Sequence, residues 1–145
     1  MKKLVLPASA AAICTLILAA TSLAAAQKTT WTAALSSVQE VPKQVVKDTA
    51  AHGLFKATVS GSKLKWRLTF AKLTGAATAA HIHTGAKGKS GNVLIPLCAP
   101  CHSGVSGTAT LSAAALNDFK KHLLYVNVHT AKNPAGEIRG QLARG

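Results

Sequence analysis

Acidic residues are scarce in this chain. Four Asp and Glu residues stand among 145, against 17 Lys and Arg, and the formal net charge at pH 7 is +13. A hydrolase that works with two carboxylates has little to draw on in such a sequence. Aromatic residues make up only 4% of the chain, and no aromatic-rich basic motif of the RNA-binding kind occurs. Since a P-loop and a Gly-x-Ser-x-Gly motif are also missing, we expect a binding protein rather than an enzyme, and no nucleic-acid partner.

Long hydrophobic runs are missing everywhere except at the start. Residues 4–23 are almost wholly apolar, follow two lysines, and lead to three alanines at 24–26. A positive segment, an apolar segment and a small-x-small site are typical of a secretory signal peptide. We predict a signal peptide over residues 1–26 and a single exported domain over residues 27–145, periplasmic or secreted, without a transmembrane segment. The alternative is a retained membrane anchor, because the apolar run is nearly long enough to span a bilayer.

Cysteine is rare as well, with three in the chain. Cys14 lies in the predicted leader, so Cys98 and Cys101 remain as a pair, and in an oxidising compartment such a pair is most simply a disulfide. Residues 98–102 also read Cys-Ala-Pro-Cys-His, the attachment motif of c-type haem, with His102 as axial ligand. Haem is the less favoured alternative, because the chain has few aromatics and its one methionine, Met1, is lost with the leader. Thiolate metal binding or redox exchange is a further alternative.

The rest of the chain alternates apolar and polar residues with the period of a β-strand. The clearest case is residues 64–70, where Leu64, Trp66 and Leu68 alternate with charged and polar residues. Ser112 is the predicted N-cap of one helix over residues 113–122. We predict strands at residues 29–38, 51–59, 64–70, around 81–83, and at 93–97, 105–111, 124–129 and 137–142. Seven or eight short strands with one short helix predict an all-β fold, an antiparallel Greek-key β-sandwich.

The last predicted strand carries two charged residues, Glu137 and Arg139, on either side of Ile138. If Ile138 points inward, both charged side chains point outward, because side chains alternate along a strand. The default expectation is a surface ion pair, worth at most about 1 kcal/mol.

Three histidines are placed where they could converge. His81 and His83 are two residues apart and therefore share one face of a strand, and His129 ends another predicted strand. Imidazole nitrogens suit Cu(II), Zn(II) and Ni(II), so neighbouring strands would make a copper-like or zinc site, with His52 as a fourth candidate ligand. The alternative is a structural role, in which these histidines form hydrogen bonds within the fold. The expected partners are then Asn127, Thr84 or Glu137.

Three blocks of sequence carry a resemblance to a known family. They are AHIH at residues 80–83, YVNVHT at 125–130 and NPAGEIRGQ at 133–141. Together they resemble the signature blocks of the chordin-type (CHRD) domain, over residues 30–142. The resemblance implies a β-sandwich found in exported bacterial proteins and in a secreted animal antagonist of growth-factor signalling, with no defined reaction. The histidine spacing is also similar to the copper site of Cu/Zn superoxide dismutases, but the residues of their zinc half are missing, so dismutase activity is not expected.

The basic residues are spread along the chain and would keep a secreted β-protein soluble. The alternative is attraction to anionic envelope polymers or to a lipid surface. Together, these observations predict an exported, non-enzymatic CHRD-domain protein that binds a copper-like ion through its histidines. Two other functions stay open: a structural or adhesive domain of the cell envelope without a metal, and a small c-type haem or redox protein.

Overall fold

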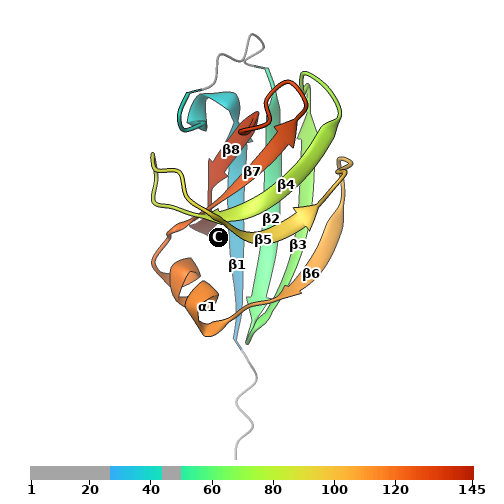
Figure 1. Cartoon of the computed structure of the whole chain (residues 1–145). Coiled ribbons are helices and arrows are strands. Elements are labelled where there is room, and N and C mark those ends of the chain that lie inside the picture. Colours follow the sequence, from blue (N-terminus) through green and yellow to red (C-terminus); the bar gives the residue numbers. More distant parts are fainter. Residues whose placement is uncertain (1–26, 44–49) are drawn as a thin grey trace, which may run out of the picture.

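The computed structural model describes residues 27–43 and 50–145 (Figure 1). The predicted signal peptide lies outside the described residues and stays a prediction. Within the described ranges, no helix combines the length and the apolar character that crossing a membrane requires.

The described residues form strands with one α-helix and one short 3-10 helix. In chain order these are β1 (Lys28–Ser36), η1 (Ser37–Gln39), β2 (His52–Ser60), β3 (Lys63–Ala71), β4 (Ala77–Thr84), β5 (Val93–Cys98), β6 (Ser106–Thr110), α1 (Ala113–Lys120), β7 (Leu124–Thr130), β8 (Ile138–Gln141) and β9 (Ala143–Arg144). The predicted all-β fold is confirmed, and every predicted strand is present to within a few residues. The two-residue β9 was not predicted.

One continuous antiparallel sheet contains all of these strands. Its order is β5-β4-β7-β8-β1-β2-β3-β6, and β9 pairs with β1. The sheet bends so that β5, β4 and β7 lie in front of β1, β2 and β3 (Figure 1). The fold is therefore a nearly closed, barrel-like sheet, in which hydrogen-bonded strands join the two layers expected for a sandwich.

Strand β8 makes this connection between the two layers. It pairs with β7 along its length and reaches β1 through the pair Ser36 and Arg139. Gly140 lies so close to β1 that a Cβ atom there would clash with the carbonyl oxygen of Ala34. The lack of a side chain at Gly140 thus lets β8 approach β1.

The interior is filled by the inward half of each alternating strand. Leu64, Trp66 and Leu68 are buried as predicted, while the intervening residues of β3 are exposed. Helix α1 closes one end of the sheet and packs Phe119 edge-on against Trp31, with ring centroids 5.2 Å apart. The predicted N-cap is confirmed, because the Ser112 hydroxyl accepts from the Ala115 amide at 3.1 Å.

The helix ends at Lys120, two residues earlier than expected. The reason is local, since His122 has a positive φ of 57°, which cannot continue a right-handed helix. The exposed ring of His122 lies with its centroid 5.5 Å from that of Trp31.

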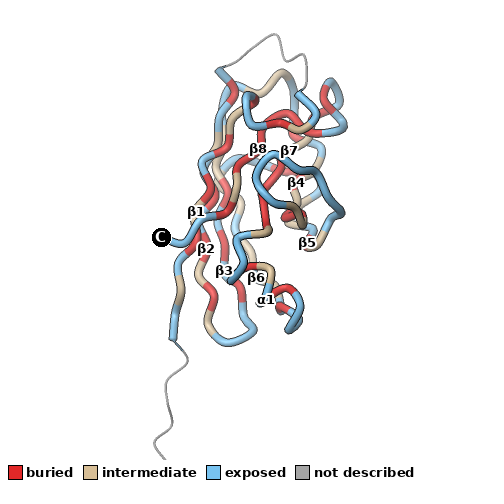
Figure 2. The backbone as a smooth tube through the Cα atoms, turned by 90° about the vertical axis from the view of Figure 1, so that its left-hand side faces the viewer, coloured by how far each residue is buried: buried red, intermediate tan, exposed pale blue. Residues whose placement is uncertain are grey.

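The outer face of β7 and β8 is covered, although the sequence predicted that it would be exposed. Glu137 and Arg139 are only 0% and 2% exposed, so the predicted surface ion pair is wrong. Arg139 Nη2 donates to the carbonyl of Lys89 at 2.7 Å, and Gln141 Nε2 donates to that of Gly85 at 2.9 Å. The loop that follows β4 therefore lies over this face (Figure 2) and buries side chains that strand alternation alone places in water.

Candidate metal centre

The three predicted histidines come from two adjacent strands. His81 and His83 lie on β4 and His129 on β7, and the two strands pair in antiparallel register, with His81 opposite Asn127 and His83 opposite Tyr125. The intervening residues Ile82 and Val128 fill the core, so the histidines all project from the outer face of the sheet.

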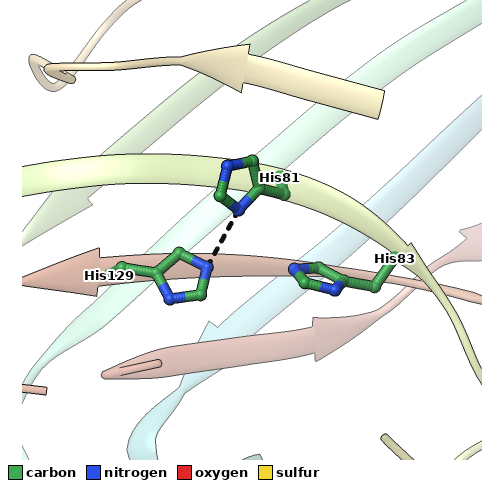
Figure 3. Close-up of side chains that lie close together, drawn as sticks. All are labelled: His81, His83 and His129. Atoms are coloured by element: carbon green, nitrogen blue, oxygen red, sulfur yellow. Dashed lines mark hydrogen bonds between the residues drawn. The ribbon is translucent and has the colours of Figure 1, made fainter. Parts of the chain in front are cut away.

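The imidazole rings converge on one point (Figure 3). One nitrogen from each ring can be chosen so that all of them lie within 4.8 Å of one another. His81 Nδ1 and His129 Nε2 are 3.1 Å apart. The ring of His83 completes the group, with centroids 5.5 Å from His81 and 5.9 Å from His129. His83 is buried, whereas His81 and His129 keep partial exposure, which leaves the cluster open to small solutes on one side.

Backbone carbonyls fix the tautomers of two of the rings. His129 Nδ1 lies 3.0 Å from the carbonyl oxygen of Pro134, and His83 Nδ1 lies 3.1 Å from that of Gly91. A carbonyl can only accept, so each Nδ1 carries the proton and each Nε2 presents a lone pair. Metal-binding histidines are usually held in this way, with the second ring nitrogen donating to a carbonyl.

The Nε2 atom of His83 is the strongest indication that the cluster binds a ligand. Within the described part of the chain, His83 Nε2 is buried and has no hydrogen-bond partner. A buried polar atom without a partner is unfavourable, typically by about 1–3 kcal/mol, and a bound ion would satisfy it. His129 Nε2, by contrast, is met by His81 Nδ1, which must donate to it while both rings are neutral. An ion bound between these rings would take the place of that shared proton.

Burial keeps the three rings neutral. Desolvation, together with the smaller effects of the neighbouring rings of His129 and His83, lowers the pKa of His81 to about 4. Desolvation also lowers the pKa of His83 and of His129, although the Gly91 and Pro134 carbonyls act in the opposite direction. Neutral imidazoles are the form that binds metal ions, so at neutral pH few protons compete for these nitrogens.

Tyr125 and Arg139 hold His83 from the side. The Tyr125 ring lies parallel to that of His83, with centroids 4.9 Å apart, and its hydroxyl accepts from the Gly91 amide at 3.2 Å. The Arg139 guanidinium sits over Tyr125, 3.5 Å from its ring centre. The three side chains thus form one stack, and Gly91 forms hydrogen bonds with both His83 and Tyr125.

Glu137 fixes the turn that supplies the Pro134 carbonyl. Its carboxylate accepts from the Thr74 amide at 2.5 Å, the Thr74 hydroxyl at 2.7 Å, the Thr130 hydroxyl at 2.6 Å and Asn133 Nδ2 at 3.0 Å. Burial acts to raise the pKa of Glu137, but these hydrogen bonds outweigh it and hold the pKa below its ordinary value. Thr130 and Asn133 flank the turn after β7, so Glu137 supports His129 indirectly, by fixing the turn that contains Pro134.

A second buried carboxyl, Glu40, lies behind Asn127. Both of its oxygens accept from Asn127 Nδ2, at 3.2 and 3.1 Å. Burial raises the pKa of Glu40 to about 7, although Asn127 and the charge of Arg139 lower it. Asn127 therefore faces Glu40. The ring nitrogens of the cluster lie within hydrogen-bond distance of the Gly91 and Pro134 carbonyls and of one another, and not of Asn127, Thr84 or Glu137.

The other predicted site residues lie apart from this cluster. His52 is exposed at the start of β2, where its Nδ1 lies 2.8 Å from the Ala50 carbonyl, and it is not among the residues brought together. Cys98 and Cys101 form a disulfide, with sulfurs 2.10 Å apart. The bond uses both sulfur atoms that haem attachment or thiolate metal binding would need.

Several supporting residues were not predicted, namely Gly91, Pro134, Tyr125 and Glu40. Two signals for them were present in the sequence. Tyr125 shares the outward face of its strand with His129, at an even spacing. The turn with Pro134 follows His129 directly, which places a free carbonyl near that ring. Gly91 and Glu40 gave no such signal, since each approaches from a separate loop.

The chain matches a known protein family. No curated protein sequence and no solved structure matches it. The family model described as the CHRD domain matches residues 31–142, which begin within β1, end just after β8 and include all three clustered histidines. This match covers well over half of the chain, and the protein accordingly belongs to the CHRD domain family.

Proposed function

We propose that this protein is an exported, non-enzymatic CHRD-domain protein that binds a copper-like transition-metal ion through His81, His83 and His129. The observation that carries the proposal is the buried, unpartnered Nε2 of His83 beside two further imidazoles. Three protein ligands leave an open position, to which water or an exogenous ligand can bind.

The donor set favours copper or zinc over the harder cations. All three ligands are neutral nitrogens, and among the described residues no carboxylate or thiolate belongs to the group. Imidazole suits Cu, Zn and Ni, and Cu(II) binds most tightly in the usual divalent series. Magnesium and calcium prefer oxygen ligands and have none here.

The spacing of the rings is already close to what an ion requires. Nitrogens bound tetrahedrally at about 2.05 Å lie about 3.3 Å apart. His81 Nδ1 and His129 Nε2 stand 3.1 Å apart, and the third nitrogen is within 4.8 Å. For all three nitrogens to reach one ion, the third must move closer to the other two by rotation of its ring.

Export is supported by the predicted leader and by the disulfide, which is typical of oxidising compartments. The test is to express the full chain and recover the mature protein from periplasm and medium. We expect the intact mass to equal that of a chain that begins at Gln27. A chain that keeps residues 1–26 and stays with the membrane would contradict the export proposal and leave the metal site standing.

Metal binding is tested by titrating the metal-free protein with Cu(II) and Zn(II) in a calorimeter. We expect one equivalent to bind, with the His81→Ala/His129→Ala variant losing at least about a hundredfold in affinity. The matched control is His52→Ala/His102→Ala, which removes two exposed histidines outside the cluster. Equal affinity of the wild type and the cluster variant would refute the proposal, provided that circular dichroism shows both to be folded.

A further inference from the structure

A second feature lies on the outer face of β1, β2 and β3, away from the histidines on β4 and β7. The outward residues of β1, β2 and β3 include a group of exposed cations, which we call the cationic face: Lys28, Lys56, Lys63, Lys65 and Arg67. Strands β1, β2 and β3 form the left side of Figure 2, whereas β4 and β5 lie on the right. The cationic face and the metal centre are thus separate surfaces.

The charges of this face are not balanced locally. Strands β1, β2, β3 and β6 contain no Asp or Glu, and of the described acidic residues Glu40 and Glu137 are buried elsewhere while Asp118 lies on α1. Lys56 and Arg67 are directly opposite each other in the β2–β3 register. Like charges in such a pair repel and destabilise a sheet. A bound anion that bridges Lys56 and Arg67 would remove this repulsion, which gives a reason for the otherwise destabilising pair.

Hydroxyl groups are interleaved with the cations. Lys65 pairs with Thr58 on one side and with Thr108 on the other, and Lys63 pairs likewise with Ser60 and Thr110. The surface is also hollowed, with a depression of about 450 Å³ whose lining includes Thr30, Thr32, Lys56, Thr58, Lys65 and Arg67. Each cation therefore has a neutral hydrogen-bonding neighbour rather than a counter-ion.

We infer that the cationic face binds a linear acidic polysaccharide. Lys63, Lys65 and Arg67 are two residues apart along one extended strand, which spaces them about 6.8 Å from each other in a straight row. A row of this kind fits a chain with regularly repeated carboxylates, and the hydroxyls between the cations can bond to the sugar hydroxyls.

Other polyanions fit this face less well. The aromatic residues of these strands, Trp31, Phe55, Trp66 and Phe70, have the inward parity. Trp31 and Trp66 also line the depression, but they are only 4% and 7% exposed and offer little ring surface for stacking on nucleic-acid bases. Leu54 is the large hydrophobic residue exposed on this side, which gives a lipid bilayer little to bury. Recognition here is ionic and polar.

The experiment uses the purified exported protein and polygalacturonate as the probe, immobilised on a biosensor surface at low ionic strength. We expect binding that is lost as salt rises, because exposed charges are screened. The Lys56→Thr/Arg67→Thr variant should bind about tenfold more weakly, since two exposed ion pairs are removed. Its melting temperature should be unchanged or higher, because a repulsive pair has gone.

The matched control is Lys87→Thr/Lys89→Thr, which lowers the net charge equally in the exposed loop over β7 and β8. It should keep wild-type binding within about twofold. Equal weakening of both variants would mean that only overall charge matters and would overturn the inference. So would a lack of binding, or tighter binding to duplex DNA or to phosphatidylglycerol vesicles than to polygalacturonate.

Discussion

Tyr125 lies face to face with His83, with ring centroids 4.9 Å apart and planes inclined by only 8°. Arg139 covers the other side of the Tyr125 ring. His83 is the buried histidine of the cluster, and its orientation depends on this stack and on the Gly91 carbonyl. The stack therefore sets how well its Nε2 is aimed.

Replacing Tyr125 by Leu should weaken Cu(II) binding about 10- to 100-fold, the usual range for residues that orient a ligand. Phe at the same position keeps the ring and loses only the hydroxyl, so it should stay within about tenfold of the wild type. Calorimetric titration measures both. Equal affinity in Tyr125→Leu and the wild type would show that the stack does not position His83.

Glu137 should be among the residues whose loss most affects stability. Glu137→Gln puts an amide where several donors converge, and we expect the free energy of unfolding at pH 7 to fall by about 3 kcal/mol. Urea denaturation measures this loss. A fall below about 0.5 kcal/mol would mean that the network contributes little.

The same residue makes a predictable contribution to acid stability. The pKa of Glu137 is lower in the fold than in the unfolded chain, so the unfolded state takes up its proton first as pH falls. Its stabilisation is complete above the ordinary carboxyl pKa and is lost as pH drops through the lowered value. Glu137→Gln should lack this part of the acid transition.

Glu40 should affect the pH dependence of stability in the opposite direction to Glu137. Its pKa is raised from 4.5 to about 7 in the fold, so the native state keeps a proton that the unfolded chain has released. Stability should fall as pH rises from about 4.5 to about 7, by about 3 kcal/mol in total. Glu40→Gln stays neutral and offers a donor near the unpartnered Oδ1 of Asn127. We expect this variant to be more stable than the wild type at pH 8, and about equal to it at pH 4.5.

Gly140→Ala should destabilise the fold by about 2 kcal/mol, because the new methyl group would meet the Ala34 carbonyl. Gly75→Ala is the control, since a Cβ there has no neighbour within 4 Å. Thermal unfolding of both variants decides the matter. Equal melting temperatures would show that β8 can move away from β1 without loss.

Strand alternation predicted much of this fold. Leu64, Trp66 and Leu68 identified β3 and its inward face, and the same period placed His81 and His83 together. The pairing of β4 with β7 was a hypothesis, since alternation gives the face of a strand and not its neighbour. The register that brings His129 beside His81 confirms it.

Alternation could not predict the burial of Glu137 and Arg139. It correctly gave their outward parity, but the outer face of β7 and β8 is covered by chain from other parts of the sequence. Arg139 bonds to the loop residue Lys89, and Glu40 reaches Asn127 from the segment after η1. Coverage of a strand by residues distant in the sequence does not alter the alternation of that strand. Alternation therefore predicted a sandwich whose outer face is exposed to solvent.

The histidines and the core residues alternate along the same two strands. His81 and His83 lie on the outer face, whereas Ala80, which precedes them, and Ile82, which lies between them, are buried in the interior. Substitutions at His81 and His83 therefore need not disturb the core packing that holds the barrel together. The domain is suited to serve as a scaffold in which coordination chemistry can be exchanged residue by residue while the architecture is kept.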